Sequence, residues 1–274
     1  VRGRKDLENL SIPFIGEIPQ YLSAKKKLGF DKHTQSVMKA IVVKEGNRNI
    51  INEAFRVLRS NIDFMAGKDS GQNVFMLTSF NPGSGKSFLA MNIAMSFAIK
   101  KKRILVIDGD LRHGSTSSYV DSPKTGLSDY LGNRVSDWKE IIVKDEKYDN
   151  LHIIPIGTVP PNPTELLEDG KLATLIEVLR SEYDYIFIDC PPIDIVADAQ
   201  IIEKLADRTV FVVRSGLLNR RMLPELENIY QEKRFKNLSV ILNGTESAGG
   251  RYGYRYGYRN GYSSYYGNKG KMGG

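Results

Sequence analysis

The chain has little of what several protein classes require. It has one cysteine, Cys190, so a disulfide framework within it is excluded, and a reducing cytoplasm suits it. Its three histidines, His33, His113 and His152, do not have the spacing of zinc ligands. No run of about 18 or more apolar residues occurs, so we expect that this chain does not itself span a membrane. Its 274 residues can hold one sizeable domain with appendages.

The net charge of +7 is concentrated at the two ends of the chain. Residues 1–49 hold ten Lys or Arg and five Asp or Glu, and residues 246–274 hold five and one. Residues 50–245 are nearly neutral, with 24 basic and 26 acidic side chains. This distribution argues against a nucleic-acid-binding face on a folded central domain.

One loop has the composition of a phosphate-binding P-loop. The apolar run Val74–Leu77 precedes a segment that ends in Gly-Lys-Ser, although Phe80 replaces the first glycine of the usual pattern. Small residues let backbone N–H groups turn onto a phosphate chain, where a lysine can reach the β- and γ-phosphates and a serine can bind Mg²⁺. The residues expected to contact ATP here are Pro82, Gly83, Ser84, Gly85, Lys86, Ser87 and Phe88.

Acidic residues follow two further apolar runs. Ile104–Ile107 leads to Asp108 and Asp110, and Tyr185–Ile188 leads to Asp189. Short, fully apolar runs are typical of buried parallel strands, which deliver side chains to the carboxyl edge of a sheet, where ligands of open α/β sheets bind. With the P-loop, these acids predict a Mg²⁺–nucleotide site.

The alternation of expected strands and helices predicts a doubly wound α/β fold with a mostly parallel sheet, and together with the P-loop motif it indicates the P-loop NTPase type. From Glu246 onward the chain has few aliphatic residues and many glycines, which predicts a disordered tail. Helices are expected over 50–65, 88–100, 171–181, 198–205 and 221–233, and strands over 74–78, 104–107, 151–156, 185–189, 209–213 and 238–242.

The motifs together resemble those of the bacterial tyrosine kinases of capsule and exopolysaccharide synthesis. That family combines Pro-Gly before Gly-Lys-Ser, an Asp-x-Asp-x-Arg motif and an Asp-x-Pro-Pro motif, which here are 82–87, 108–112 and 189–192. The tail adds a tyrosine cluster: Tyr252, Tyr254, Tyr256, Tyr258, Tyr262, Tyr265 and Tyr266. Related partition and septum-placement ATPases have a second lysine in the P-loop, at the position of Asn81, so its absence favours the kinases.

The resemblance implies roles for the site residues. Lys86, Asp108 and Asp110 would be catalytic, with Asp108 accepting the proton of an incoming tyrosine hydroxyl. Ser87, Asp110 and Asp189 would hold Mg²⁺. The division of roles among the three acids stays open. Asn243 lies where relatives contact adenine, although a lone asparagine there could equally be a turn residue.

The resemblance also implies partners. Glu53, Arg56 and Arg59 match the family's oligomerisation motif, whereas the structural alternative is an ion pair inside one helix. In a ring, the tail of one subunit would be phosphorylated in the site of the next. Further expected partners are the polysaccharide export machinery and a cognate tyrosine phosphatase, with no nucleic acid. A nucleotide-switch ATPase without kinase activity is the alternative, and an RNA-binding or self-associating tail is a weaker one.

The expected domain organisation has three parts. Residues 1–45 resemble the juxtamembrane segment of one-chain members, 46–245 form the kinase domain, and 246–274 form the tail. Because the chain starts at Val1 and not Met, we expect a fragment of a longer protein, attached to the cytoplasmic face of the inner membrane through a preceding region. The basic patch 25–27 would contact anionic lipid or be simply solvated.

Overall fold

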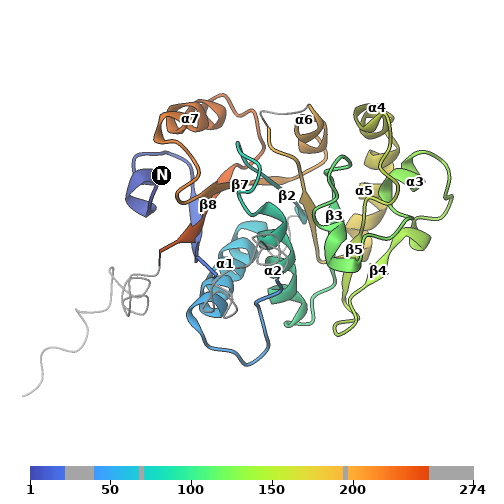
Figure 1. The fold of residues 1–274 in the computed structure, drawn as a ribbon, viewed down its shortest axis with the longest axis horizontal. Coiled ribbons are helices and arrows are strands. Elements are labelled where there is room, and N and C mark those ends of the chain that lie inside the picture. The colour runs from blue at the N-terminus through green and yellow to red at the C-terminus, as the bar shows by residue number, and fades with distance from the viewer. Residues whose placement is uncertain (22–39, 68–70, 194–196, 247–274) are drawn as a thin grey trace, which may run out of the picture.

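The computed structural model describes residues 1–21, 40–67, 71–193 and 197–246 (Figure 1). In these residues an eight-stranded sheet has the order β1-β8-β7-β2-β6-β3-β5-β4, in which only β4 pairs in the antiparallel direction. The strands are β1 Phe14–Pro19, β2 Val74–Thr78, β3 Ile104–Asp108, β4 Val143–Lys144, β5 Leu151–Ile154, β6 Tyr185–Asp189, β7 Arg208–Arg214 and β8 Ser239–Thr245. The helices are α1 Ile50–Ala66, α2 Lys86–Ala98, α3 Leu127–Leu131, α4 Pro163–Glu168, α5 Lys171–Glu182, α6 Asp198–Glu203 and α7 Leu223–Gln231.

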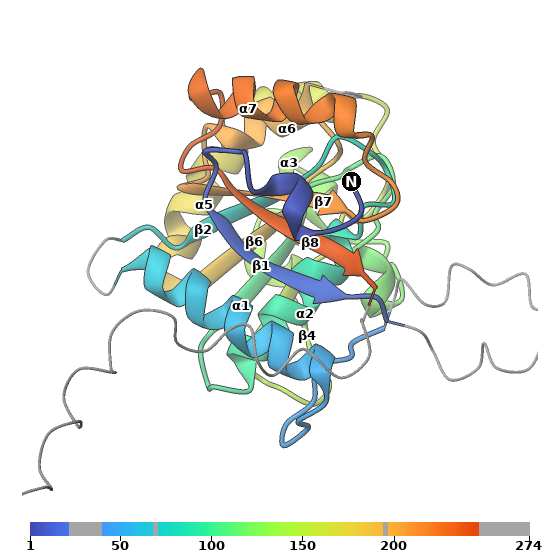
Figure 2. The same cartoon turned by 90° about the vertical axis from the view of Figure 1, so that its left-hand side faces the viewer.

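Helices cover both faces of the sheet, as predicted for a doubly wound fold. Helices α1 and α2 pack on one face, and α5, α6 and α7 lie on the other (Figures 1 and 2). The strands β2, β3 and β6 are buried over their whole length, which explains their unbroken apolar sequences.

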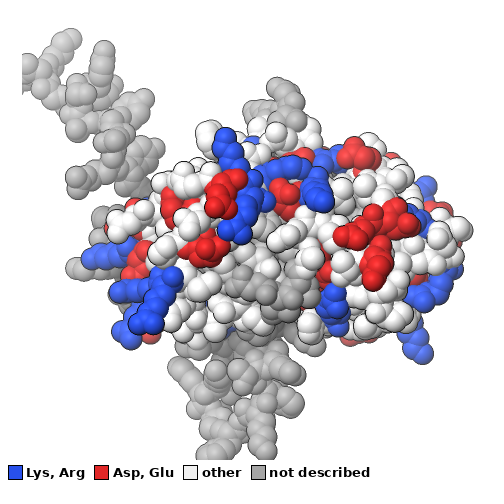
Figure 3. All heavy atoms as spheres, turned by 90° about the horizontal axis from the view of Figure 1, so that it is seen from above, with Lys and Arg blue, Asp and Glu red and all other residues white. Residues whose placement is uncertain are grey.

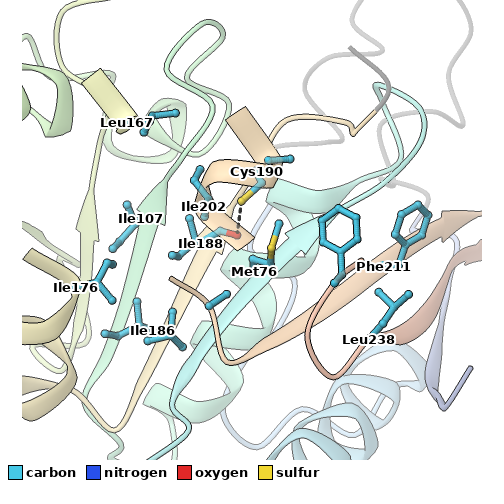
Figure 4. Packing of buried hydrophobic residues seen from close by; sticks show 14 of the residues in the cluster. Met76, Ile107, Leu167, Ile176, Ile186, Ile188, Cys190, Ile202, Phe211 and Leu238 are labelled. Atoms are coloured by element: carbon cyan, nitrogen blue, oxygen red, sulfur yellow. Dashed lines mark hydrogen bonds between the residues drawn. The ribbon is translucent and has the colours of Figure 1, made fainter. Parts of the chain in front are cut away.

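Two buried clusters hold these layers together. On the α5–α7 face, Met76, Ile188 and Phe211 pack in one continuous core (Figure 4). Cys190 belongs to this core: it is fully buried, and burial raises the pKa of its thiol well above the usual value. It therefore acts as a small buried hydrophobic residue.

Helix α1 forms where its sequence predicts. The Asn49 side chain caps the helix by accepting a hydrogen bond from the Asn52 amide at 2.9 Å. The apolar face of α1, including Phe55, Leu58 and Ile62, is fully buried against the sheet and α2. The opposite face of α1 remains exposed, and it includes Glu53.

The structure differs from the sequence analysis in the first 45 residues, where no strand is expected. Strand β1 pairs in parallel with β8 and extends the sheet by one strand (Figure 2). Part of the expected N-terminal segment is thus packed into the main sheet. The basic patch 25–27 lies outside the described residues, as do the seven tail tyrosines.

Acidic and basic side chains are interspersed on the face seen from above α4, α6 and α7 (Figure 3). Among the described residues, no helix combines the length and apolar character needed to cross a membrane.

Candidate active site

The P-loop connects β2 to α2 at the carboxyl edge of the sheet. Gly83 and Gly85 have φ values of +73° and +92°, which only glycine adopts readily. A side chain at Gly85 would also collide with Asn243, because a Cβ atom there would lie 2.2 Å from the amide nitrogen Nδ2. Helix α2 begins directly afterwards at Lys86, so the unpaired N–H groups of its first turn, together with its dipole, favour an anion at the loop.

Phe80, which replaces the first P-loop glycine, points into the core. It is 3% exposed and packs edge-to-face against Phe211, with 4.9 Å between ring centroids. The substitution therefore leaves the phosphate-binding side of the loop unobstructed. It adds an aromatic contact between the loop and β7.

Lys86 is buried beside the loop. Its Nζ atom lies 3.4 Å from the hydroxyl oxygen of Ser79, and the residue is 9% exposed. Of the loop residues predicted to contact ATP, Pro82 and Gly83 are exposed, whereas Ser84 is buried. The Phe88 side chain packs against Phe55 of α1, so it could contact nucleotide only through its backbone.

Asp108 and Asp189 end neighbouring strands and lie opposite each other in the register of β3 and β6. Asp189 accepts hydrogen bonds through Oδ2 from the hydroxyls of Ser87 at 2.5 Å and Thr116 at 2.8 Å. Asp108 accepts through Oδ2 from the backbone N–H of Ser117 at 2.6 Å and from its hydroxyl at 2.7 Å. The sequence prediction that the P-loop serine and these acids meet at one edge is therefore confirmed.

Burial makes it costly for these two carboxyls to be charged together. Desolvation, with the negative field of Asp189 as a second cause, raises the pKa of Asp108 to about 8, against the hydrogen bonds from Ser117. Desolvation also raises the pKa of Asp189, while nearby Lys86 acts in the opposite direction. A cation placed between the acids would relieve this cost.

The residues present fit a Mg²⁺ ion. Oδ1 of Asp108 and Oδ1 of Asp189 are buried and have no hydrogen-bond partner among the described residues. Within the described ranges no three His, Cys, Asp or Glu side chains group closely enough to hold a metal alone. Mg²⁺, however, is commonly held by one or two carboxylates with waters and substrate phosphates, so Asp189 and the Ser87 hydroxyl suffice as protein ligands.

Asp110 organises the turn after β3. Its Oδ1 accepts from the backbone N–H groups of Arg112 and His113, at 3.3 Å each, and lies 3.2 Å from Nδ1 of His113. It is 8% exposed, so it lies nearer the solvent than Asp108, which is fully buried. Asp110 is therefore placed to meet a ligand arriving from the solvent side.

The arginine of the second motif connects the site to two helices. Arg112 pairs with the fully buried Asp198 at the start of α6, at 3.1 Å, and donates to the hydroxyl of Thr164 on α4, at 3.0 Å. Thr164 in turn donates to Asp198 at 2.7 Å. This network fixes the loop after β3 against the α4–α6 side of the molecule.

Comparison with known proteins agrees with these features. Residues 72–236 match the family model described as an AAA domain. Over 210 residues the chain is 32% identical to the putative tyrosine-protein kinase CapB of Staphylococcus aureus, a match that covers 76% of this chain and 91% of the relative. It is 35% identical over 221 residues to the tyrosine-protein kinase CpsD of Streptococcus pneumoniae, covering 80% and 92%. The chain belongs to the bacterial tyrosine-protein kinases.

The kinase domain of the Escherichia coli tyrosine kinase ETK has the same fold. The two superpose with a TM-score of 0.77 at 27% identity, covering 96% of this chain and all of that one. The resemblance expected from the three motifs is thereby confirmed, and so is the expected fold class. The P-loop edge is therefore the candidate active site of this bacterial tyrosine-protein kinase.

Some residues of this kinase site were not predicted from the sequence. Thr116 and Ser117 bind the two central acids, Asp198 binds Arg112, and Arg214 donates to the backbone of Gly83 at 2.8 Å. The run of hydroxyl residues 115–118 directly after the second motif was the available signal for the first two. Asp198 and Arg214 have no such signal, because their partners are distant in sequence.

The three residues of the expected oligomerisation motif lie on α1 and have partners within the chain. Arg56 forms an ion pair with Glu53 on the same helix and donates to the backbone carbonyl of Asn47. Arg59 donates to the carbonyl of Ser96 at 2.9 Å, and burial lowers the pKa of its guanidinium. The intrahelical ion pair is thus present, and it leaves open the pairing of these residues with another subunit.

Proposed function

We propose that this kinase transfers the γ-phosphoryl group of ATP to tyrosine hydroxyls, including those of its own tail, Tyr252, Tyr254, Tyr256, Tyr258, Tyr262, Tyr265 and Tyr266. The observation that carries the proposal is the meeting of the P-loop, Ser87 and two carboxylates with free buried oxygens at one sheet edge. Phosphoryl transfer requires mainly positioning and charge neutralisation, which this edge is built to supply.

Each residue has a proposed role in the reaction. The backbone N–H groups of 83–86 and the first turn of α2 hold the β-phosphate, and Lys86 stabilises charge on the transferring group. Asp110, Asp189 and Ser87 hold Mg²⁺, which neutralises charge on the phosphates. Asp108 orients the tyrosine hydroxyl and accepts its proton, a role supported by its free, buried Oδ1. Asn243 borders the nucleotide site through its contact with the P-loop.

We propose that phosphorylation occurs in trans within a ring of subunits joined through Glu53, Arg56 and Arg59. The exposure of Glu53 supports this assignment, since half of its side chain is accessible. Residues 46–245 would form the catalytic unit, extended by strand β1 from the 1–45 segment. The tail 246–274 would be its substrate.

The proposed cellular role is control of capsular or exopolysaccharide synthesis at the cytoplasmic face of the inner membrane. It follows from membership in the family, whose relatives include a putative tyrosine-protein kinase in the cps region of Klebsiella pneumoniae. The export machinery and a cognate tyrosine phosphatase would be partners, and a region preceding this chain would supply the membrane attachment.

Incubation with γ-labelled ATP and Mg²⁺, followed by mass spectrometry, tests the proposal. We expect phosphate on tyrosines between 252 and 266, and none in the Lys86→Met variant, because no other side chain of the loop can replace its charge. The Lys102→Met variant removes the same charge from an exposed site and should react like the parent. ATP hydrolysis without any phosphotyrosine would instead support a nucleotide-switch ATPase.

A further inference from the structure

Side chains at the ends of two neighbouring strands form hydrogen bonds with the backbone of the P-loop. Arg214 and Asn243 are register partners at the carboxyl ends of β7 and β8. Nη1 of Arg214 donates to the backbone carbonyl of Gly83 at 2.8 Å, and Nδ2 of Asn243 donates to the backbone carbonyl of Ser84, also at 2.8 Å. Two successive carbonyls of the loop are therefore bound by neighbouring side chains of the sheet.

The geometry of the peptide bond gives these contacts a consequence for ligand binding. In a planar trans peptide the C=O and N–H groups point in opposite directions. When the carbonyl of Gly83 is held toward Arg214, the N–H of Ser84 points away from it. The same relation holds between the Ser84 carbonyl, bound by Asn243, and the N–H of Gly85.

We propose that Arg214 and Asn243 act as a clamp of positioning residues that fixes two P-loop N–H groups in the orientation that binds phosphate. The inference rests on the proposed nucleotide-dependent function and assigns Arg214 to it. The glycines on either side of the clamped peptides, with their positive φ values, allow the turn but do not restrict it. The clamp supplies that restriction.

The connection that carries Arg214 is itself held in place. The N–H of Ser215 donates to the Asn243 carbonyl at 2.8 Å, and its hydroxyl donates to the carbonyl of Arg2 at 2.8 Å. Further along the same connection, Arg220 forms an ion pair with Asp6. Residues of the N-terminal segment thus fasten the turn that places Arg214 against the loop.

Titration calorimetry on the full chain tests the clamp with Mg·ADP and with adenosine. Arg214→Met keeps an unbranched, flexible stem and removes the guanidinium donors. We expect it to weaken Mg·ADP binding about tenfold or more, because only a fraction of the loops would remain in the competent conformation. Arg214→Lys, which keeps one charged donor, should recover most of the affinity. Adenosine affinity should stay the same in both variants, since adenosine has no phosphate for the loop to bind.

Two controls separate positioning from charge and from folding. Arg221→Met removes the same charge from an exposed site nearby and should bind Mg·ADP like the parent. The melting temperature without ligand should be nearly unchanged in Arg214→Met. Combined with Asn243→Ala, Arg214→Met should cost less than the sum of the two single effects, because both side chains restrain the same turn.

The outcomes distinguish the clamp from the proposed function. If the parent binds Mg·ADP and Arg214→Met binds it equally well, the clamp is wrong and the kinase site stands. If Arg214→Met weakens adenosine and Mg·ADP alike, Arg214 contacts the nucleoside and the clamp is again wrong. If the parent binds no Mg·ADP, the proposed function fails and the clamp fails with it.

Discussion

Asp108 and Asp189 lie side by side at the ends of two central parallel strands, and each keeps one buried oxygen without a hydrogen-bond partner among the described residues. Their other oxygens are bound by different groups. Asp189 receives the hydroxyl of the P-loop residue Ser87, whereas Asp108 receives both donors of Ser117. The two acids therefore have unlike environments, which supports unlike roles.

The first prediction separates these roles. Asp108→Asn should abolish phosphoryl transfer and weaken Mg·ADP binding much less than Ser87→Ala or Asp110→Asn. An asparagine oxygen can still accept from Ser117, so the loop should keep its position, while the proton acceptor is lost. Calorimetry with Mg·ADP and phosphotyrosine detection measure the two effects. The exposed Asp169→Asn serves as the charge-matched control. An equal loss of affinity in Asp108→Asn would make Asp108 a metal ligand instead.

The second prediction concerns the unusual P-loop residue. Phe80→Gly restores the common P-loop pattern but removes a ring packed on Phe211, so we expect it to lower the free energy of unfolding by about 3–5 kcal/mol. Phe80→Leu should cost about 1–2 kcal/mol, because most of the volume remains. Urea denaturation of the nucleotide-free protein measures both. A glycine variant as stable as the leucine variant would show that the ring contact contributes nothing.

The third prediction concerns pH. His152 is bound by the Tyr183 hydroxyl at 2.7 Å and by the Asp149 carbonyl at 3.0 Å, and burial lowers its pKa below 6.5. The unfolded chain then binds a proton at His152 more readily than the folded chain. The free energy of unfolding should therefore decrease as the pH falls below 6.5 toward the folded pKa of His152. Above that window it should contribute no pH dependence.

Denaturation at pH 7.5 and at pH 5.5 measures the effect of His152. His152→Gln should lose less stability than the parent between these two values, since glutamine does not titrate. Tyr183→Phe removes one hydrogen bond but leaves the burial, which is the main cause, so it should keep most of the parent's loss. An identical loss in parent and His152→Gln would place the titration elsewhere.

The central strands and their acids were predictable because a buried parallel strand must be apolar throughout and must end at the ligand-binding edge. Strand β1 was not predictable, because it lies at the edge of the sheet, pairs only with β8 and contains Gly16 and Pro19, which are both unfavourable in strands. The hydrogen-bond partners of the acids could not be predicted from the sequence either. That Ser117 binds Asp108, or that Arg214 binds Gly83, depends on loop paths that no local pattern encodes.

The last prediction concerns assembly through α1. Glu53, Arg56 and Arg59 are spaced three residues apart, so Arg56 lies about 60° around the helix from each of the other two, and Glu53 and Arg59 lie about 120° apart. Arg56→Ala with Arg59→Ala should prevent the proposed ring, measured by light scattering on dephosphorylated protein. Arg59 also donates to Ser96 on α2, so the variant must first be shown to keep its melting temperature. Arg48→Ala with Lys102→Ala removes the same charge from exposed sites and should assemble like the parent.

Glu53→Gln tests the same interface without touching the contact to α2. Its carboxylate pairs only within α1 in the described part of the chain, and such an exposed pair contributes a few tenths of a kcal/mol at most, so folding should be unaffected. If Glu53 pairs with arginines of a neighbouring subunit, the ring of the variant should dissociate.

Phosphorylation of the tail should also favour dissociation of the ring, because each phosphotyrosine adds roughly −1.5 to −2 charge and the tail would then repel the acids of the neighbouring site. Full assembly of both the Glu53→Gln and the double arginine variants would limit the role of these residues to their contacts within one subunit, which are the Glu53–Arg56 ion pair and the hydrogen bonds to Asn47 and Ser96.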